Sequence, residues 1–162
     1  TCALPICDVP LTEVGHDQAR AAAAALKRCG ITAIYSSALQ RARDTADYVA
    51  RELGLAVQVV PGLGERNWGV LEGKPREMRV RGVTPAGAET LEAFASRVHA
   101  GLAQIDRGVP LIVAHAGVFR VLCNTLGVPE SEEPVSNAHP ICCCPPDESR
   151  ATWRFEPLAA KR

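Results

Sequence analysis

Hydrophobic positions recur along the chain in two ways, at helical spacing over long segments and as short continuous β-rich runs. Apolar side chains that return every three or four residues predict helices, and short apolar or β-branched runs predict strands. The predicted helices are Thr12–Cys29, Leu39–Leu53 and Glu89–Ile105, with a fourth that opens at Val118 and ends before Gly127. The predicted strands are Ile31–Ser36, Ala56–Val60 and Leu111–Ala114.

The order of these elements predicts an α/β fold. Strands that alternate with helices form a largely parallel sheet with helices on both faces, which gives three layers. Two further runs, Pro140–Cys144 and Ala151–Glu156, flank the turn-rich Pro145–Arg150 and predict an antiparallel hairpin that adds an edge to the sheet. A chain of 162 residues is long enough for one hydrophobic core, so we expect a single domain over residues 1–162.

Charge and cysteine content narrow the class of protein. The 18 Lys and Arg residues balance 18 Asp and Glu residues, which argues against a nucleic-acid or membrane-surface partner. No apolar run approaches the ~20 residues of a membrane-spanning helix, and no signal-peptide pattern is present, so we expect a cytoplasmic protein. The seven cysteines are an odd number, which is typical of reduced thiols and not of a disulfide framework.

One junction between a strand and a helix carries candidate chemistry. The predicted strand Leu111–Ala114 ends on His115, and Ala116 and Gly117 lead into the next helix. Open α/β sheets bind ligands at the carboxyl ends of their strands, and the bare amides and positive dipole end of a helix attract anions such as phosphate. A histidine satisfied inside the core would give the same pattern, so the junction alone leaves both interpretations open.

Other segments carry further candidates in a recognisable order. Arg41 lies just inside a predicted helix after a strand, and Glu65 lies on the long connection Pro61–Thr84. The segments are Pro10–Ala19 (PLTEVGHDQA), Ser36–Ala46 (SSALQRARDTA), Gly64–Gly73 (GERNWGVLEG), Pro85–Thr90 (PAGAET) and Val113–Arg120 (VAHAGVFR). From Asp8 to about Asn137, the chain resembles the histidine phosphatase superfamily, the phosphoglycerate-mutase-like fold, in the order and approximate spacing of these motifs.

The resemblance implies a phosphoryl-transfer mechanism. In this family a histidine of an Arg-His-Gly motif attacks phosphorus and becomes phosphohistidine. A second histidine and two arginines hold the phosphoryl oxygens, and a carboxyl group protonates the leaving oxygen. By motif position His115 matches the second histidine, Arg41 the second arginine and Glu65 the acid. Arg41, His115, Ala116 and Gly117 would bind the phosphate of a small phosphorylated metabolite, with no cofactor and no metal ion.

These residue types suit that chemistry. A phosphoryl group in transit spreads its charge over the equatorial oxygens, so fixed donors and cations do most of the work. Arg41 offers a planar fork for two oxygens, and His115 can supply a proton or a positive charge near neutral pH. The structural alternatives are a solvated charged run from Arg41 to Asp47 and an ordinary loop ion pair between Glu65 and Arg66.

The sequence departs from the family pattern at its start. The family places its Arg-His-Gly strand ahead of the segment that here begins at Asp8, but only Thr1–Cys7 precede it, without histidine or arginine. Thr1–Ile6 equal the translation of a common sequencing-library adaptor, so we expect them to be a scar and not native protein. We therefore expect an N-terminally truncated chain that lacks the first central strand and the nucleophile, is inactive and poorly stable, and derives from an active parent.

Several alternatives stay open. Mutases of the family carry a long insertion between the loop of Glu65 and the segment at Pro85, and the short connection here favours a phosphatase over phosphoglycerate-mutase-type transfer. A noncatalytic relative would only bind phosphorylated ligands. Cys142–Cys144 suggest a zinc or redox module, but adjacent strand residues point to opposite faces, so we expect buried thiols instead. Glu72 and Glu89 are expected to be structural, and the sequence does not predict the oligomeric state.

Overall fold

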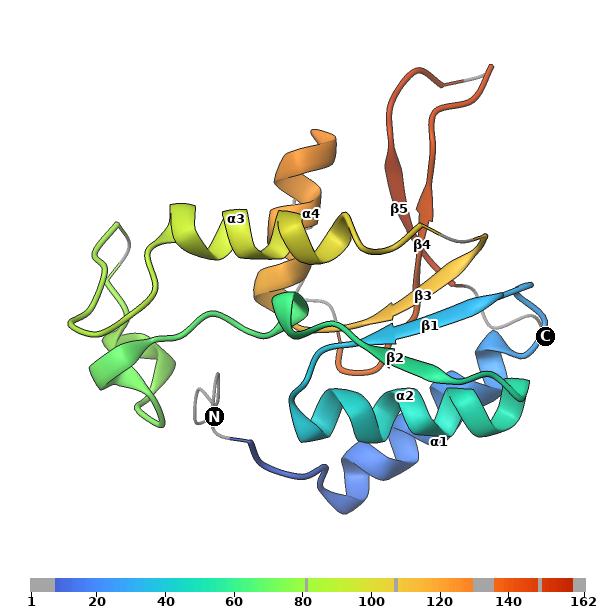
Figure 1. Cartoon of the computed structure of the whole chain (residues 1–162), viewed down its shortest axis with the longest axis horizontal. Helices are drawn as coiled ribbons and strands as arrows, with labels where there is room; N and C mark the ends of the chain where they lie inside the picture. Colours follow the sequence, from blue (N-terminus) through green and yellow to red (C-terminus); the bar gives the residue numbers. More distant parts are fainter. Residues whose placement is uncertain (1–7, 81, 107, 130–135, 149, 159–162) are drawn as a thin grey trace.

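A computed structural model describes residues 8–80, 82–106, 108–129, 136–148 and 150–158 of the chain. Helices and strands alternate along it (Figure 1). In chain order they are α1 (Glu13–Leu26), β1 (Ala33–Ser36), α2 (Gln40–Leu53), β2 (Val57–Val59), α3 (Leu91–Leu102), β3 (Pro110–Val113), α4 (Ala116–Leu126), β4 (Ile141–Cys144) and β5 (Arg154–Pro157). Three 3-10 turns, Pro61–Leu63, Gly69–Leu71 and Arg76–Met78, lie on the connection between β2 and α3.

A three-stranded parallel sheet forms the centre, in the order β2-β1-β3. Ser36, at the end of β1, lies opposite Val59 of β2 and Val113 of β3. The chain leaves β1 toward β2 on one side and later returns to β3 on the other. The carboxyl ends of all three strands therefore meet at one edge, next to the point where the strand order reverses, which is where open α/β sheets bind ligands.

Side chains of β1 alternate between two hydrophobic clusters, one on each face of the sheet. Ile34, with 0% of its surface exposed, packs with buried residues of α1 and α2, and Ala33 and Tyr35 pack with buried residues of α3 and α4. Burial of a large aliphatic side chain such as Ile34 contributes about 1.5–3 kcal/mol. Figure 1 shows α1 and α2 below the sheet and α3 above it. The predicted α/β fold with three layers is confirmed.

The ends of α1 and α4 differ by two or three residues from the predicted bounds. The hydroxyl of Thr12 accepts a hydrogen bond from the N–H of Gly15 at 3.2 Å, which satisfies one of the free donors at the start of α1. α1 stops at Leu26, three residues before the predicted end at Cys29. α4 begins at Ala116, with His115 as its N-cap residue, and not at Val118 as predicted. Ala116 and Gly117 are thus first-turn residues of the helix and not a linker before it.

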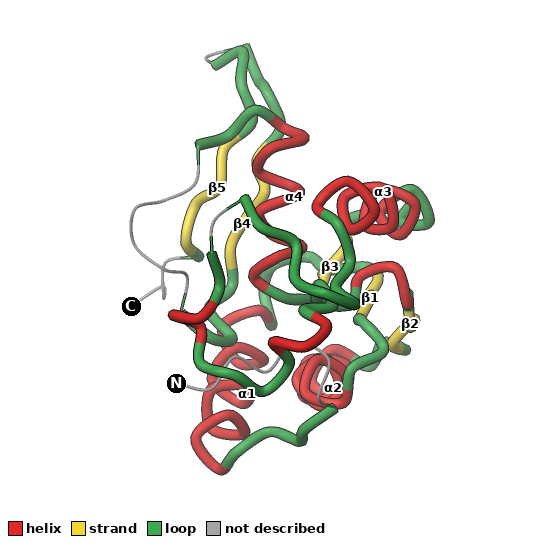
Figure 2. The backbone as a smooth tube through the Cα atoms, turned by 90° about the vertical axis from the view of Figure 1, so that its left-hand side faces the viewer, coloured by secondary structure: helices red, strands yellow, loops and turns green. Residues whose placement is uncertain are grey.

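The predicted antiparallel hairpin is present as β4 and β5, with Cys143 opposite Phe155. Its predicted attachment to the parallel sheet is wrong, because β4 and β5 form a separate two-stranded sheet and no described strand links the two sheets by hydrogen bonds. Phe155 instead packs against Phe119 of α4, with 4.9 Å between the ring centroids. Figure 2 shows the hairpin on the side of α4 that faces away from the parallel sheet.

The cysteines of β4 are more exposed than predicted. Cys142 and Cys143 are exposed and Cys144 is half-buried. Cys123 of α4 is buried. No described helix combines the length and the apolar composition that crossing a bilayer requires. The adaptor-like Thr1–Ile6 and the expected loss of a first strand concern positions outside the described residues.

Candidate functional site

The three predicted site residues lie together at the carboxyl edge of the sheet. His115 follows β3, Arg41 lies in the first turn of α2 after β1, and Glu65 follows the first 3-10 turn after β2. Nη2 of Arg41 is 3.4 Å from Nδ1 of His115. The N–H of Gly117 donates to Oε2 of Glu65 at 3.2 Å. Arg41 and His115 are 74 positions apart in the sequence, and Glu65 and Gly117 are 52 positions apart. These pairs become neighbours because three parallel strands end side by side.

His115 is held on both ring nitrogens. Ser37, fully buried at the end of β1, places its Oγ 2.7 Å from Nε2, opposite the contact of Nδ1 with Arg41. Burial, assisted by the nearby positive charges of Arg41 and Arg97, lowers the pKa of His115 from 6.5 to about 4. The imidazole is therefore neutral at neutral pH. Of the two roles expected of His115 near neutral pH, a neutral ring leaves the supply of a proton from its N–H.

The carboxyl group of Glu65 occupies the start of α4. Its Oε1 accepts the N–H of Arg66 at 2.8 Å, and its Oε2 accepts the N–H of Gly117. A Cβ on Gly117 would lie 2.1 Å from Oε1 of Glu65 and 3.0 Å from Cζ of Phe94, so only glycine leaves room for this carboxyl. The amide predicted to bind phosphate thus holds a carboxylate, which the positive end of the helix favours for the same reason.

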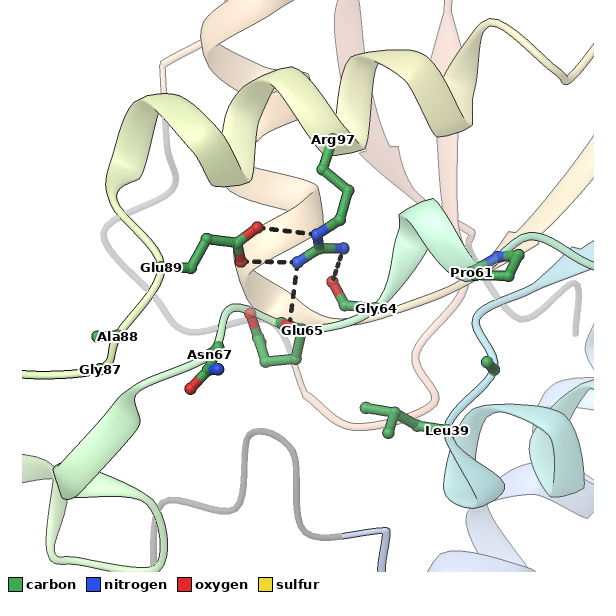
Figure 3. Close-up of a pocket in the computed structure, with 10 residues that line it drawn as sticks. Leu39, Pro61, Gly64, Glu65, Asn67, Gly87, Ala88, Glu89 and Arg97 are labelled. Carbon is green, nitrogen blue, oxygen red and sulfur yellow. Dashed lines mark hydrogen bonds and ion pairs between the residues drawn. The ribbon is translucent and has the colours of Figure 1, made fainter.

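A clamp formed by Arg97 and Glu89 fixes the segment that carries Glu65. The guanidinium of Arg97 donates to both carboxylate oxygens of Glu89, at 2.9 and 2.8 Å. It also donates to the main-chain oxygens of Gly64 at 3.1 Å and Glu65 at 3.3 Å (Figure 3). A further bond runs to the main-chain oxygen of Gly62 at 2.9 Å. The bond from Arg97 is the main cause of a lowered pKa of Glu89. Glu89 was expected to be structural, and its contacts agree with that role.

Close main-chain packing supports the clamp. A Cβ on Gly62 would lie 2.9 Å from Cα of Gly101, so the turn before Glu65 rests directly on α3. Sequence reasoning missed Arg97, although a signal existed. Phe94, Val98 and Gly101 are buried on one face of α3, and position 97 lies on that face at helical spacing, which is unusual for a charged side chain without a partner.

A cavity of about 510 Å³ lies on the Glu65 side of the site. Glu65, Asn67, Glu89 and Arg97 provide its polar lining. The rest of the lining consists of the small or apolar residues Ala38, Leu39, Pro61, Gly64, Gly87 and Ala88. Figure 3 shows Leu39, at the start of α2, across from the stretch of Gly87 and Ala88. Neither Arg41 nor His115 lines the cavity, so it adjoins the predicted phosphate ligands without including them.

Stacked arginines stiffen the connection after Glu65. The guanidinium carbons of Arg66 and Arg79 lie 4.5 and 3.8 Å from the ring centroid of Trp68. Arg66 is 6% exposed and donates through Nε to the main-chain oxygen of Glu89 at 2.9 Å. The connection therefore has a packed interior of its own, as expected of a long loop with a function. The alternative of an ordinary exposed ion pair between Glu65 and Arg66 does not fit this burial.

The thiols of β4 do not form a metal site with other described residues. Sγ of Cys142 and Sγ of Cys144 are 3.4 Å apart, and Cys143, between them along the strand, contributes no third ligand. Among the described residues, no three His, Cys, Asp or Glu side chains are grouped so that they could hold a metal ion. Although Cys143 is exposed, partial desolvation of its sulfur and the neighbouring thiols raise its pKa to about 11, which disfavours the thiolate that a metal ion requires.

Comparison with known proteins places this geometry in a family. The sequence profile of the histidine phosphatase superfamily (branch 1) matches residues 5–145. The probable phosphoglycerate mutase GpmB of Yersinia pestis (strain Pestoides F) is 35% identical in an alignment of 145 positions, with 78% of this chain and 67% of that protein covered. The corresponding protein of Yersinia pseudotuberculosis (serotype O:1b) matches equally well.

Solved structures agree with the sequence comparison. A mycobacterial glucosyl-3-phosphoglycerate phosphatase in complex with VO3 has a TM-score of 0.79 and 25% identity, covering 99% of this chain and 91% of that chain. A protein from Thermus thermophilus has a TM-score of 0.73 and 28% identity, covering 96% of this chain and 89% of that chain. With most of its length matched in both sequence and fold, the chain belongs to the histidine phosphatase superfamily.

Proposed function

We propose that this chain provides the phosphate-binding and acid-bearing part of a phosphomonoester hydrolase that acts on small phosphorylated metabolites through a phosphohistidine intermediate. The observation that carries the proposal is the contact of Arg41 with His115 beside the carboxyl of Glu65, next to a cavity of about 510 Å³. The names of similar proteins support the same chemistry, since they include a probable mutase and a phosphatase of phosphorylated compounds.

Each residue has a defined task in the proposed reaction. The guanidinium of Arg41 donates to two phosphoryl oxygens, and His115 donates to a third, so charge that spreads over these oxygens is stabilised. The first-turn amides of Ala116 and Gly117 add the positive end of α4. Glu65 gives a proton to the leaving alcohol, which occupies the cavity that Glu65 lines.

The nucleophile is not among the histidines of these 162 residues. None of the four histidines stands in an Arg-His-Gly sequence. We therefore propose that the 162-residue chain binds phosphate without turning it over. A longer polypeptide with an Arg-His-Gly strand ahead of Asp8 would complete the site, and its in-line attack would give phosphohistidine and then inorganic phosphate.

A phosphoglycerate-mutase-type transfer is the second candidate. The 35% identity to the probable phosphoglycerate mutases and the shared Glu65-Arg66 pair favour it. Against it stand the short connection between Gly73 and Pro85 and the likeness to a phosphatase structure over 99% of this chain. A relative that only binds phosphorylated ligands is the third candidate. The first two candidates differ in the acceptor of the phosphoryl group. A phosphatase transfers it to water and releases inorganic phosphate, whereas a mutase transfers it to a phosphoglycerate.

The experiment begins with anion binding. Calorimetric titration of the 162-residue chain with inorganic phosphate is expected to show binding, and Arg41→Ala should weaken that binding by about tenfold to a hundredfold. Arg43→Ala, an exposed arginine two positions further along α2, is the matched control and leaves the affinity unchanged. Equal effects of the two variants, or no binding, would refute the proposed phosphate site.

Turnover is tested in the longer polypeptide. It is expected to hydrolyse aryl and alkyl phosphates, and the 162-residue chain to hydrolyse neither. Glu65→Gln slows the release of a poor alkyl leaving group far more than that of p-nitrophenolate, which departs without a proton. A uniform loss on both substrates would show that Glu65 does not act as the acid.

A further inference from the structure

Two consecutive serines at the end of β1 have different environments. Both are fully buried. The hydroxyl of Ser36 donates to the main-chain oxygen of Ser37 at 2.9 Å. The Oγ of Ser37 lies 2.7 Å from Nε2 of His115 and accepts the N–H of Leu39 at 3.4 Å. Only the second serine therefore reaches the predicted phosphate ligand.

Donor and acceptor roles around His115 follow from the chemistry of its neighbours. A guanidinium has only donors, so the 3.4 Å contact of Arg41 with Nδ1 requires a lone pair on that nitrogen. A neutral imidazole carries its one proton on the other nitrogen, which is Nε2. The N–H at Nε2 then donates to Oγ of Ser37, whose second lone pair accepts the N–H of Leu39.

We propose that Ser37 is a positioning residue that holds His115 with Nε2 protonated and the lone pair of Nδ1 toward Arg41, so that an oxyanion bound beside Arg41 enters together with one proton. The proton comes from solvent and forms an N–H bond at Nδ1, and the resulting imidazolium donates to the anion. Without that proton, the lone pair of Nδ1 would face an anionic oxygen and repel it. The uptake of a proton with the anion rests on the proposed phosphate site, whereas the tautomer of His115 does not.

The charges around His115 explain why the ring changes state on binding. Burial disfavours the imidazolium most, and the positive charges of Arg41 of α2 and Arg97 of α3 add to that effect. The carboxyl of Glu65, on the connection after β2, is bound to the amide of Gly117, two residues after His115. A doubly charged anion beside Arg41 adds two negative charges at contact distance, which outweighs the two arginines and draws a proton to Nδ1. Anion affinity therefore falls as the pH rises.

The tautomer is measured without any ligand. Nitrogen-15 spectra of the histidine rings at about pH 7 should show Nδ1 of His115 without a proton in the native chain. Ser37→Ala is expected to give a mixture of both tautomers, and Ser37→Thr, which keeps the hydroxyl, to restore the native signal. Ser36→Ala removes a buried hydroxyl from the same strand end and leaves the spectrum unchanged. A proton on Nδ1 in the native chain, or a native spectrum in Ser37→Ala, would overturn the proposal.

Proton uptake is measured with sulfate, which keeps its two charges over the range of about pH 5 to 8. Calorimetry in two buffers of different ionisation enthalpy is expected to give uptake of about one proton per sulfate. Ser37→Ala should weaken sulfate binding by about five- to tenfold, and Ser36→Ala should not. Sulfate binding without proton uptake would overturn the proposed link between anion binding and protonation of His115. Absence of sulfate binding would refute the proposed phosphate site and the coupling with it, whereas the ligand-free spectra still decide the role of Ser37.

Discussion

The contact between Gly117 and Glu65 predicts that an alanine in the first turn of α4 destabilises the chain. Alanine is usually favoured over glycine in a helix by about 1 kcal/mol. At position 117, however, the added Cβ would lie 2.1 Å from Oε1 of Glu65 and 3.0 Å from Cζ of Phe94. The carboxyl must move away, which breaks its bond with the N–H of Gly117.

The expected loss of stability in Gly117→Ala is the difference between the lost hydrogen bond and the gain in helix propensity. A hydrogen bond to a charged group contributes about 1.5–3 kcal/mol, and helix propensity returns about 1 kcal/mol. Gly117→Ala should therefore lower the free energy of unfolding by about 0.5–2 kcal/mol. Gly15→Ala, in the first turn of α1, is the matched control. There the new Cβ meets Cδ2 and Cβ of Leu11 at 3.1 and 3.3 Å, contacts that a small shift of Leu11 relieves, so that variant should gain stability.

Urea unfolding of both variants, alone and combined with Glu65→Ala, measures the contact. Removing the carboxyl first takes away the main clash, so the cost of Gly117→Ala should shrink by about 1 kcal/mol or more in that background. The reasoning fails if Gly117→Ala stabilises the chain as much as Gly15→Ala does. It also fails if the cost is the same with and without Glu65, since Phe94 alone would then explain it.

The titration of His115 and the clamp of Arg97 give two further predictions. Because the pKa of His115 is about 4 in the folded chain and 6.5 in the unfolded chain, stability is complete above about pH 6.5 and falls as the pH drops toward 4, by at most about 3 kcal/mol. Urea unfolding at several pH values should show a flatter profile for His115→Gln, and a native-like profile in that variant would refute the assignment. Arg97→Ala removes two bonds to Glu89 and three to main-chain oxygens and should cost about 3 kcal/mol or more. Arg20→Ala removes an exposed pair with Asp17 and should leave the urea midpoint unchanged, so equal losses in the two arginine variants would contradict the role of the clamp.

The sequence was sufficient for the order of elements and for the layers, because both follow from local periodicity. Ala42, Ala46 and Val49 fall on one face of α2 at helical spacing, and the glycine after Leu53 takes the left-handed conformation that ends the helix. The two-residue alternation in β1 sends Ile34 to one face of the sheet and Tyr35 to the other. These patterns need no knowledge of distant contacts.

The errors concern contacts between distant parts of the chain. The bond between Ser37 and His115 joins residues 78 positions apart, and no local pattern distinguishes Ser37 from the equally buried Ser36. The hairpin was expected at the sheet edge because antiparallel strands commonly extend such sheets, but its contact with Phe119 of α4 decides where it lies. Exposure of Cys142 follows from the same placement.

The start of α4 illustrates how a correct chemical interpretation can be incomplete. The sequence around Gly117 predicts an anion at the helix N-terminus, since the free amides and the dipole favour negative charge whatever its source. In the structure the negative charge comes from Glu65 of the same protein, and the missing Cβ of Gly117 makes the space for it. A phosphate that enters beside Arg41 meets an amide already bonded to a carboxylate, and two anions cannot share that donor without strong repulsion. Glu65 must therefore release the amide when phosphate binds there, which frees its carboxyl to turn toward the leaving group that it is proposed to protonate.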